Sequence, residues 1–552
     1  MSPFSNTSTS DRRYRAPAKD GEILCVPDFS QAISDAQSNA FELQSSQIEI
    51  AGLSLGEFRR QARHEIVSLA IDWTNQFTGG SAVCAECAHE ATALYVTGHQ
   101  PQLAHPGVWA KNFAVSAMAE RSQSLGLNII VDNDTVGTQS IRVPAGNREH
   151  PRFLTIAFDA PQPQQPWEEL SIVDREMFNS FGERVCRALE SWHIRPLIGE
   201  MWNVAVNQAE KTPSTCLALT ACRVAQERRW GLQNLELPLS VICQSQSFRM
   251  FAAHLIRNAA EFHNCYNRSV EDYRNLHRIR NHRHPVPNLT RSSDALELPL
   301  WYWESGDATR GQLFVRQTGH DIDLLCGGRV ILSTDDTALL QDLRVLQSNG
   351  KLRTRALTTT LFSRLCFADL FVHGIGGAKY DELTNQLIEE FFGQSPPAFL
   401  VLSATCHLPI DPFKVTEADA RDLAARLREL KYNADRYLSL PASNSLLAEK
   451  RELISEQNSE NNQHLPPDHH RERMQGNRHR HASFQRVNRK LSKLAANKIS
   501  VTEQKLSAVK SQLHANAILQ SREFSAVVFP AEQIHLLSND LQVMAKSAAA
   551  KS

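Results

Sequence analysis

The segment YVTGHQPQLAHPGVWAKNF, residues 95–113, decides the fold that the sequence predicts. It begins with apolar residues typical of a buried strand, and Gly98 permits a tight exit from that strand. A helix is expected to begin near Pro106, because proline suits the first turn of a helix. A second strand follows as NIIVDND, residues 128–134. Similar apolar runs alternate with helical stretches up to about Ile410, which predicts an α/β protein with a mostly parallel sheet.

The turn between these two strands carries side chains suited to an anionic ligand. A helix N-terminus offers unpaired backbone N–H groups and the positive end of the helix dipole. His99, Gln100 and His105 add side-chain donors, and Lys111 lies one turn inside the helix. We therefore predict a phosphate or carboxylate site formed by Gly98, His99, Gln100, His105, Gly107 and Lys111. An alternative, in which the histidine only caps or packs, stays open at this stage.

Two carboxylates follow the second strand. Asp132 and Asp134 come after its last apolar residue, at the carboxyl edge where α/β sheets bind their ligands. We expect one of them to orient an amine or a ribose, or to take a proton. The predicted catalytic residues are therefore His99, Asp132 and Asp134.

A glycine-rich stretch, FVHGIGGAKYDELTNQLIEEFF at residues 371–392, predicts a second strand-to-helix turn. Its glycines let backbone approach a ligand closely, and a lysine in the first helical turn can contact an anion. We assign ligand or nucleotide binding to His373, Gly374, Gly376, Gly377 and Lys379. The spacing is not that of a phosphate-binding GxxxxGK[ST] loop, which argues against a nucleoside triphosphatase of that class. A purely structural turn is the alternative.

Composition limits the classes of partner. The 552 residues contain 59 Lys and Arg and 60 Asp and Glu, a formal charge of −1, so no global field attracts nucleic acid or anionic lipid. No apolar run is long enough to cross a bilayer, and the first twenty residues lack the apolar centre of a secretory signal. We expect a cytoplasmic protein with neither a nucleic-acid nor a membrane partner.

Metal binding is not expected. Eleven scattered cysteines suit a reducing compartment better than a disulfide framework. Cys84 and Cys87 form the single CxxC, followed by His89, but no second ligand pair lies nearby to complete a zinc site. A histidine cluster comprises His469, His470, His479 and His481, and we interpret it as a polar hairpin tip in preference to a metal site.

Composition also divides the chain. Residues 1–20 are expected to be a disordered tail, and residues 21–410 the α/β core, with inserted connecting segments at about 150–300. One insertion is the basic run of Arg278, Arg280, His282, Arg283 and His284, which either binds anions or forms a solvated face. Leucines at helical spacing predict an antiparallel helical hairpin or coiled coil at 411–516, followed by a return segment and tail at 517–552.

The order of these segments resembles one family. VTGHQPQLAHPGVWAKNFAVSAMAE, residues 96–120, is similar to the TGQQ…GP…KA…A turn and helix of the cysteine-adding enzyme of bacillithiol biosynthesis (BshC). The resemblance covers most of residues 90–540 and includes NIIVDNDTV, the glycine-rich stretch and the C-terminal hairpin. The chain departs from the family pattern at His99, at Asn133 and in HGIGGAKYDE, where typical members have a GGPGE-like stretch. It resembles a divergent member.

The resemblance implies a Rossmann-like core of the nucleotidyltransferase type and a homodimer through the coiled coil. It also implies a ligase that joins cysteine, or a related small amine or thiol, to a glucosaminyl-malate-like acceptor by a carbon–nitrogen bond. An adenine nucleotide is the expected cofactor, and the expected partners are small-molecule substrates. The alternative is a non-catalytic, nucleotide-binding coiled-coil dimer of the same fold.

Overall fold

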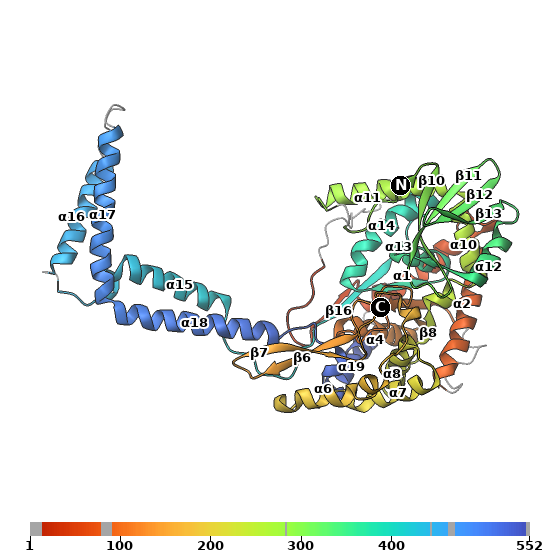
Figure 1. Ribbon diagram of the computed structural model, residues 1–552, viewed down its shortest axis with the longest axis horizontal. Helices are drawn as coiled ribbons and strands as arrows, with labels where there is room; N and C mark the ends of the chain where they lie inside the picture. The colour runs from red at the N-terminus through yellow and green to blue at the C-terminus, as the bar shows by residue number, and fades with distance from the viewer. Residues whose placement is uncertain (1–13, 79–90, 282–283, 442–443, 462–469, 548–552) are drawn as a thin grey trace. The chain divides into compact units, whose positions relative to one another are not determined.

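The computed structural model describes residues 14–78, 91–281, 284–441, 444–461 and 470–547, with side chains omitted at 460–461 and 470–477. The chain forms two compact units. One comprises the residues up to Val143, Phe153–Pro409 and those from Arg522 onward; the other comprises Pro144–Arg152 and Ile410–Ser521. The first unit contains the two larger sheets of the protein (Figure 1).

A six-stranded sheet forms the centre of the first unit. In spatial order its strands are β1 (Ile23–Val26), β16 (Phe399–Ala404), β15 (Leu370–His373), β4 (Leu94–His99), β5 (Leu125–Ile130) and β8 (Leu235–Pro238). All neighbours are parallel except β1, which pairs antiparallel with β16. The predicted α/β class with a mostly parallel sheet is confirmed.

The strand order reverses between β4 and β15. From β4 the chain proceeds outward to β5 and β8 on one side, then returns to add β15 and β16 on the other. The helices that follow β4 and β15 therefore diverge from this point, and a crevice opens at the carboxyl ends of the two strands. Such a reversal is where open α/β sheets bind ligands.

Helix α4 (Pro106–Arg121) is the most deeply buried helix next to this crevice. It packs against β4, β5 and β16, and helix α19 (Ala531–Ser547) packs against it. Pro106 occupies its first turn, as predicted, and His105 caps it. Because even Lys111 and Asn112 are buried on this helix, both polar groups need partners inside the protein or in a ligand.

A second sheet stands beside the first. It is antiparallel, in the order β13 (Arg329–Asp335), β12 (Asp321–Cys326), β11 (Gly311–Thr318), β10 (Ala295–Glu304) and β14 (Gly350–Thr354), and β9 (Arg291–Ser292) pairs with β10. β14 leads directly into helix α13 (Ala356–Cys366), which packs against β15. The second sheet thus places helix α13 next to the crevice of the first sheet.

The remaining elements of the first unit cover the sheets and connect them. Two short hairpins are β2 (Glu49–Ile50) with β3 (Leu53–Ser54), and β6 (Ser140–Gly146) with β7 (Pro151–Ala157), the second of which extends into the other unit. The helices are α1 (Phe29–Gln44), α2 (Leu55–Thr78), α5 (Arg175–Asn179), α6 (Phe181–Leu189), α7 (Ile198–Lys211), α8 (Thr215–Arg229), α9 (Leu239–Ile242), α10 (Gln246–Arg257), α11 (Ala259–Leu276), α12 (Leu339–Asn349) and α14 (Ile375–Phe392).

The second unit is mostly helical. Its helices are α15 (Glu417–Tyr432), α16 (Ser445–Asn461), α17 (His470–Leu494) and α18 (Ala496–Leu519). α15 packs against α18 and α16 against α17 (Figure 1). The contacts Phe413–Asn516 and Lys431–Glu503 make the first pair antiparallel. Each pair is short because the chain breaks between α15 and α16 and again at Ala495.

Two expectations about local order need correction. Residues 14–20 are held by the core, although they were expected in a disordered tail: Thr405 Oγ1 donates to Pro17 O at 2.7 Å, and the His407 N–H donates to Asp20 Oδ1 at 2.7 Å. The basic segment Tyr266–Leu289, which contains the run from Arg278 to His284, was expected as a connection or small inserted lobe, but its first part belongs to helix α11, which ends at Leu276. Arg278 and Arg280 are exposed beyond that helix, and His282 and Arg283 lie outside the described residues.

No helix in the described ranges is long and apolar enough to cross a membrane.

Asp369 ties the start of the central sheet to helix α2. Its buried carboxylate accepts from Arg59 at 2.8 Å, from Arg63 at 2.5 Å and from the Leu94 N–H at 2.8 Å. Asp369 directly precedes β15 and Leu94 begins β4, so one side chain fixes the two strands that flank the reversal. Removing the carboxylate of Asp369 would leave the guanidinium groups of Arg59 and Arg63 without this ion-pair partner.

We predict that Asp369→Ala lowers the free energy of unfolding by about 3–5 kcal/mol, the usual cost of breaking a buried ion pair. Urea denaturation measures the change. Glu57→Ala is the matched control, because Glu57 pairs with Arg60 on the exposed side of the same helix. Its midpoint should stay near that of the wild type, since surface ion pairs contribute little. Equal shifts for the two variants would contradict the assigned role of Asp369.

Candidate functional site

A cavity of about 600 Å³ opens at the carboxyl ends of β4, β5, β15 and β16. Gly98 and His99 line it from β4, Val372 and His373 from β15, and Ser403 from β16. It lies at the reversal of strand order between β4 and β15. The cavity therefore occupies the position at which parallel α/β sheets bind small molecules.

Three helix N-termini converge on this cavity. Residues of the first turns of α4, α13 and α14 line it, among them Gly107, Ala356 and Gly377. His105 Nδ1 caps α4 by accepting from the Gly107 N–H at 3.1 Å, whereas no side chain caps α13 or α14. Each helix directs its positive dipole end and its first N–H groups to the same space. Such an arrangement favours a negatively charged occupant.

Lys111 adds a buried ammonium group to the cavity wall. The residue is only 6% exposed, and Nζ donates to Gly98 O at 2.8 Å. Within the described segments no carboxylate lies at ion-pair distance from it. Burial lowers its pKa from 10.5 to about 8. The ammonium is thus charged at neutral pH yet lacks an anionic partner from the protein.

Two arginines approach the cavity from the second sheet, where they stack on one indole. The Arg310 and Arg355 guanidinium carbons lie 4.9 Å and 4.1 Å from the Trp301 ring centroid. Arg355 also donates to Glu297 at 2.7 Å, and Arg310 to Asn133 O at 2.9 Å. Stacking and hydrogen bonds fix both side chains, so these two guanidinium groups are preorganised beside the cavity.

A fourth cation comes from the segment that precedes α19. Arg522 lines the cavity and donates to Ser403 Oγ at 3.1 Å. Its Nε is buried without a hydrogen bond, and the nearest carboxylate oxygen, on Glu523, is 3.7 Å away. Like Lys111, this group retains capacity to bind an anion.

His99 differs from its predicted role. Nδ1 lies 2.8 Å from Gln100 O and Nε2 lies 3.2 Å from Asn112 Oδ1, so both ring nitrogens already contact the protein. Burial, followed by the charges of Lys111 and Arg223, lowers its pKa to about 3. The ring is therefore neutral, and the charge-assisted hydrogen bond expected from it does not form. The main physical reason is burial, which disfavours the charged ring, and the nearby cations of Lys111 and Arg223 add to this effect.

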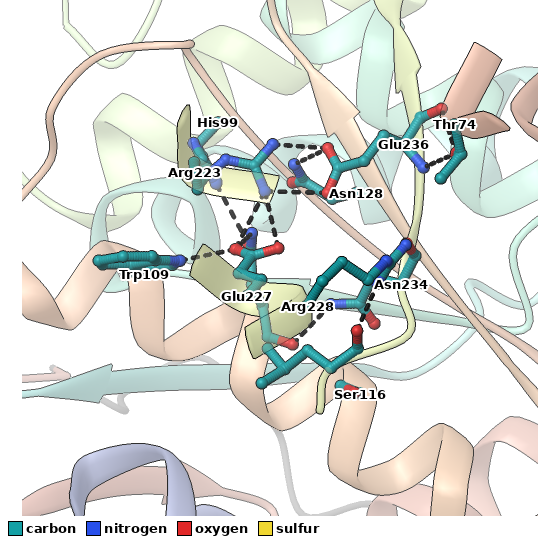
Figure 2. Close-up of polar contacts among 12 residues, drawn as sticks. Thr74, His99, Trp109, Ser116, Asn128, Arg223, Glu227, Arg228, Asn234 and Glu236 are labelled. Carbon is teal, nitrogen blue, oxygen red and sulfur yellow. Dashed lines mark hydrogen bonds and ion pairs between the residues drawn. The ribbon is translucent and has the colours of Figure 1, made fainter. Parts of the chain in front are cut away.

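A buried polar network fixes the wall behind His99 (Figure 2). The carboxylate of Glu227 accepts from Trp109 Nε1 at 2.6 Å and from Asn112 Nδ2 at 2.8 Å, and it pairs with Arg223 at 2.9 Å. The same arginine pairs with Glu236 at 2.6 Å. By accepting from the Asn112 amide nitrogen, Glu227 turns the amide oxygen toward His99. The network therefore links α8 and β8 to α4.

The two predicted aspartates lie in different surroundings. Asp134 lines the cavity, where it accepts from Gln100 Nε2 at 2.9 Å and lies 3.5 Å from Arg310. Asp132 is 3% exposed and does not line the cavity; its carboxylate accepts from the backbone and hydroxyl of Ser240. Burial and the nearby Glu168 raise the pKa of Asp132 to about 7. Of the two residues predicted as alternatives for the far side of the pocket, Asp134 lines the cavity and Asp132 is turned inward.

The glycine-rich turn forms the other side of the cavity. His373, Gly374, Gly376 and Gly377 line it, together with Gln100, His105 and Gly107 from the first turn. Lys379 follows Gly377, the last residue of α14 that lines the cavity; it is exposed and does not line the cavity. Two motifs separated by more than 250 residues in the sequence thus meet in one site.

Sequence reasoning missed the cationic wall. Arg355 follows β14 and precedes α13, the same strand-to-helix signal that identified the other two turns, and it was recognisable on that basis. Arg310, Arg522 and Trp301 carry no comparable local pattern. They belong to the site because tertiary folding brings the second sheet and the C-terminal segment to it.

In the described part of the chain, no group of three or more His, Cys, Asp or Glu side chains is arranged to hold a metal ion. Cys84, Cys87, His89 and His469 lie outside the described residues, as does the side chain of His470. The prediction about a zinc site in the CxxC region therefore stays a prediction.

No protein-family model matches this chain, and no curated protein is similar to it in sequence.

We predict that His99 stays neutral in the pH range in which an exposed histidine would gain a proton. Its folded-state pKa is about 3 and its ordinary value is 6.5, so the unfolded chain binds a proton that the folded chain excludes. Above pH 6.5 the titration of His99 therefore does not change the free energy of unfolding. As the pH falls from 6.5 toward 3, proton binding to the unfolded chain lowers this free energy. Imidazole NMR from pH 8 to pH 5 should find no His99 titration, and His99→Gln should reduce the acid sensitivity of the melting temperature. A His99 titration midpoint near 6.5 would contradict this assignment.

Proposed function

We propose that the cavity binds an anionic small molecule whose charge balances Lys111. The supporting observation is a buried ammonium at the meeting point of three helix N-termini, without a carboxylate partner among the residues described. An unpaired buried charge is costly, so a ligand that supplies the missing negative charge gains the corresponding energy. Phosphate and carboxylate groups suit these donors best.

An adenine nucleotide is the ligand we favour, on a Rossmann-like core of the nucleotidyltransferase type. The parallel order β16–β15–β4–β5–β8 supports this proposal, because doubly wound sheets bind nucleotides at the reversal of strand order. A cavity of about 600 Å³ also falls in the usual range for small-molecule sites.

The reaction we propose is that of a cysteine ligase of the bacillithiol-synthesis type. The resemblance of residues 96–120 and of the glycine-rich turn to that family supports it, since both segments line the cavity. The helix N-termini, Lys111 and Arg522 would bind phosphate or the carboxylates of a glucosaminyl-malate-like acceptor. Asp134 supplies a carboxylate that can orient the ammonium group of cysteine.

A non-catalytic nucleotide-binding protein is the alternative. It is favoured by the neutral, doubly occupied His99 and by the withdrawal of Asp132 from the cavity, which remove two of the three predicted catalytic groups. The two proposals share the anion site and differ only in whether a product forms.

The test combines binding with product detection. ADP is titrated calorimetrically into the wild type, Lys111→Met and Lys379→Met. Lys111→Met should lose about ten- to a hundred-fold in affinity, the value of a charge-assisted hydrogen bond. Lys379→Met should bind as the wild type does, because that lysine lies outside the cavity. Unchanged ADP affinity in Lys111→Met, or no binding of ADP to any of the three proteins, would contradict the nucleotide site.

Product formation is measured by mass spectrometry after incubation of the wild type with cysteine, glucosaminyl-malate and ATP. The ligase proposal requires a product with the mass of both substrates less one water. Nucleotide binding without this product would favour the non-catalytic alternative.

We also propose a homodimer held by the second unit. Its described helices leave apolar side chains exposed, among them Leu494 at 54% and Val501 at 42%, although its own core buries Val487 and Leu491. Helices with apolar residues outside their intramolecular core are typical of assemblies.

The dimer predicts that Leu494→Asp combined with Val501→Asp produces a monomer, because charge is expelled from an apolar interface. Light scattering of the full-length chain gives the mass. The matched control is Lys493→Asp with Lys505→Asp, exposed polar positions on the same two helices. A wild-type mass of one chain would exclude the dimer.

A further inference from the structure

A buried chain of three charged or titratable side chains lies beneath the glycine-rich turn. Asp381 of α14 is fully buried; its Oδ2 accepts from Arg364 at 2.7 Å and lies 2.6 Å from His373 Nε2. His373 ends β15, is 3% exposed, and lines the cavity. Strand, helix α13 and helix α14 each contribute one member, so tertiary folding assembles this chain.

The charges of this chain decide which ring nitrogen carries the proton. Arg364 and His373 lower the pKa of Asp381 to about 2 against the effect of burial, so its carboxylate is ionised and only accepts. Nε2 of His373, which faces that carboxylate, is therefore the protonated nitrogen. Burial lowers the pKa of His373, which keeps the ring neutral. The lone pair is consequently on Nδ1.

Gly377 lies directly beside this nitrogen. A Cβ at position 377 would lie 2.9 Å from His373 Nδ1, closer than side chains approach one another without displacement. At Gly374 and Gly376 a Cβ would meet nothing within 4 Å. A glycine is thus required on packing grounds at 377, next to the nitrogen that is free to accept a proton.

The other histidines described around the cavity are already engaged. Both ring nitrogens of His99 lie close to protein oxygen atoms, and His105 Nδ1 caps helix α4. His373 Nε2 lies at ion-pair distance from Asp381, although it makes no hydrogen bond of regular geometry there. It is also the one of the three whose partner is an ionised carboxylate, the arrangement that stabilises an imidazolium after proton uptake.

We propose that His373 is the proton acceptor of the cavity and that it activates the amine or thiol of the substrate. This inference rests on the proposed function, whose anion site it leaves unchanged. The N–H or S–H bond of the substrate breaks, its electron pair stays on nitrogen or sulfur, and the proton binds Nδ1. The resulting imidazolium is stabilised by the carboxylate of Asp381. The positive charges of Lys111 and Arg364 destabilise the imidazolium and so favour release of the proton.

The first test is the rate of product formation from cysteine and glucosaminyl-malate with ATP. His373→Gln should lower the rate by about 10²–10⁴-fold, the usual contribution of general acid–base catalysis, while its affinity for ADP stays within about threefold of the wild type, since phosphate binding is assigned to Lys111. His320→Asn is the control, because His320 is exposed between β11 and β12 and does not line the cavity. A wild-type rate in a folded His373→Gln protein would overturn the proposal.

The second test does not need turnover. Nitrogen-15 NMR of imidazoles in the full-length wild type, assigned by loss of the signal in His373→Gln, reports the tautomer directly. The proposal requires a proton on Nε2 and none on Nδ1 at pH 7. A proton on Nδ1 would overturn it, even if product forms. If the tautomer is as expected but no product appears, the substrate assignment fails and the proton acceptor stands.

Discussion

A buried ammonium without a carboxylate is the constraint on which the cavity depends. Lys111 projects from α4, a helix that is buried on nearly every side, and the residue is itself only 6% exposed. The protein gives it one carbonyl oxygen, that of Gly98, at the end of the adjacent strand. Burial lowers its pKa to about 8, because a charged ammonium is less favourable away from water. The net charge of the chain, −1, does not reveal the cationic groups that gather around this cavity.

The rest of the first unit is built to keep that field in place. The carboxylates of Glu227 and Glu236 share Arg223 behind the cavity, and Glu227 also accepts from Asn112, which ties helix α4 to this network. Asp369 anchors the opposite ends of β4 and β15. These buried pairs contribute little net stability in general, but they make removal of any one partner expensive. Their consequence is a rigid, preorganised positive pocket.

Much of this arrangement was accessible from the sequence, because local rules govern it. Proline at the start of α4, glycine after β4 and the glycine-rich turn before α14 identified two strand-to-helix units, and both turns line one cavity. Roles within those turns were less predictable. Asp132 and Asp134 are two residues apart, yet only the second faces the cavity, since the chain after β5 is irregular and alternation no longer applies. Charge states also depend on burial, as His99 illustrates. Arg310 and Arg522 come from distant segments that no local pattern connects.

Proton uptake on ligand binding tests the central claim most directly. Above pH 8 the unliganded ammonium of Lys111 has largely lost its proton, whereas a bound phosphate should restore it. Titration of ADP at pH 8.5 in two buffers of different ionisation enthalpy measures the protons exchanged. The account predicts net proton uptake by the wild type and none by Lys111→Met. Binding without proton uptake in the wild type, or equal uptake in both proteins, would contradict it.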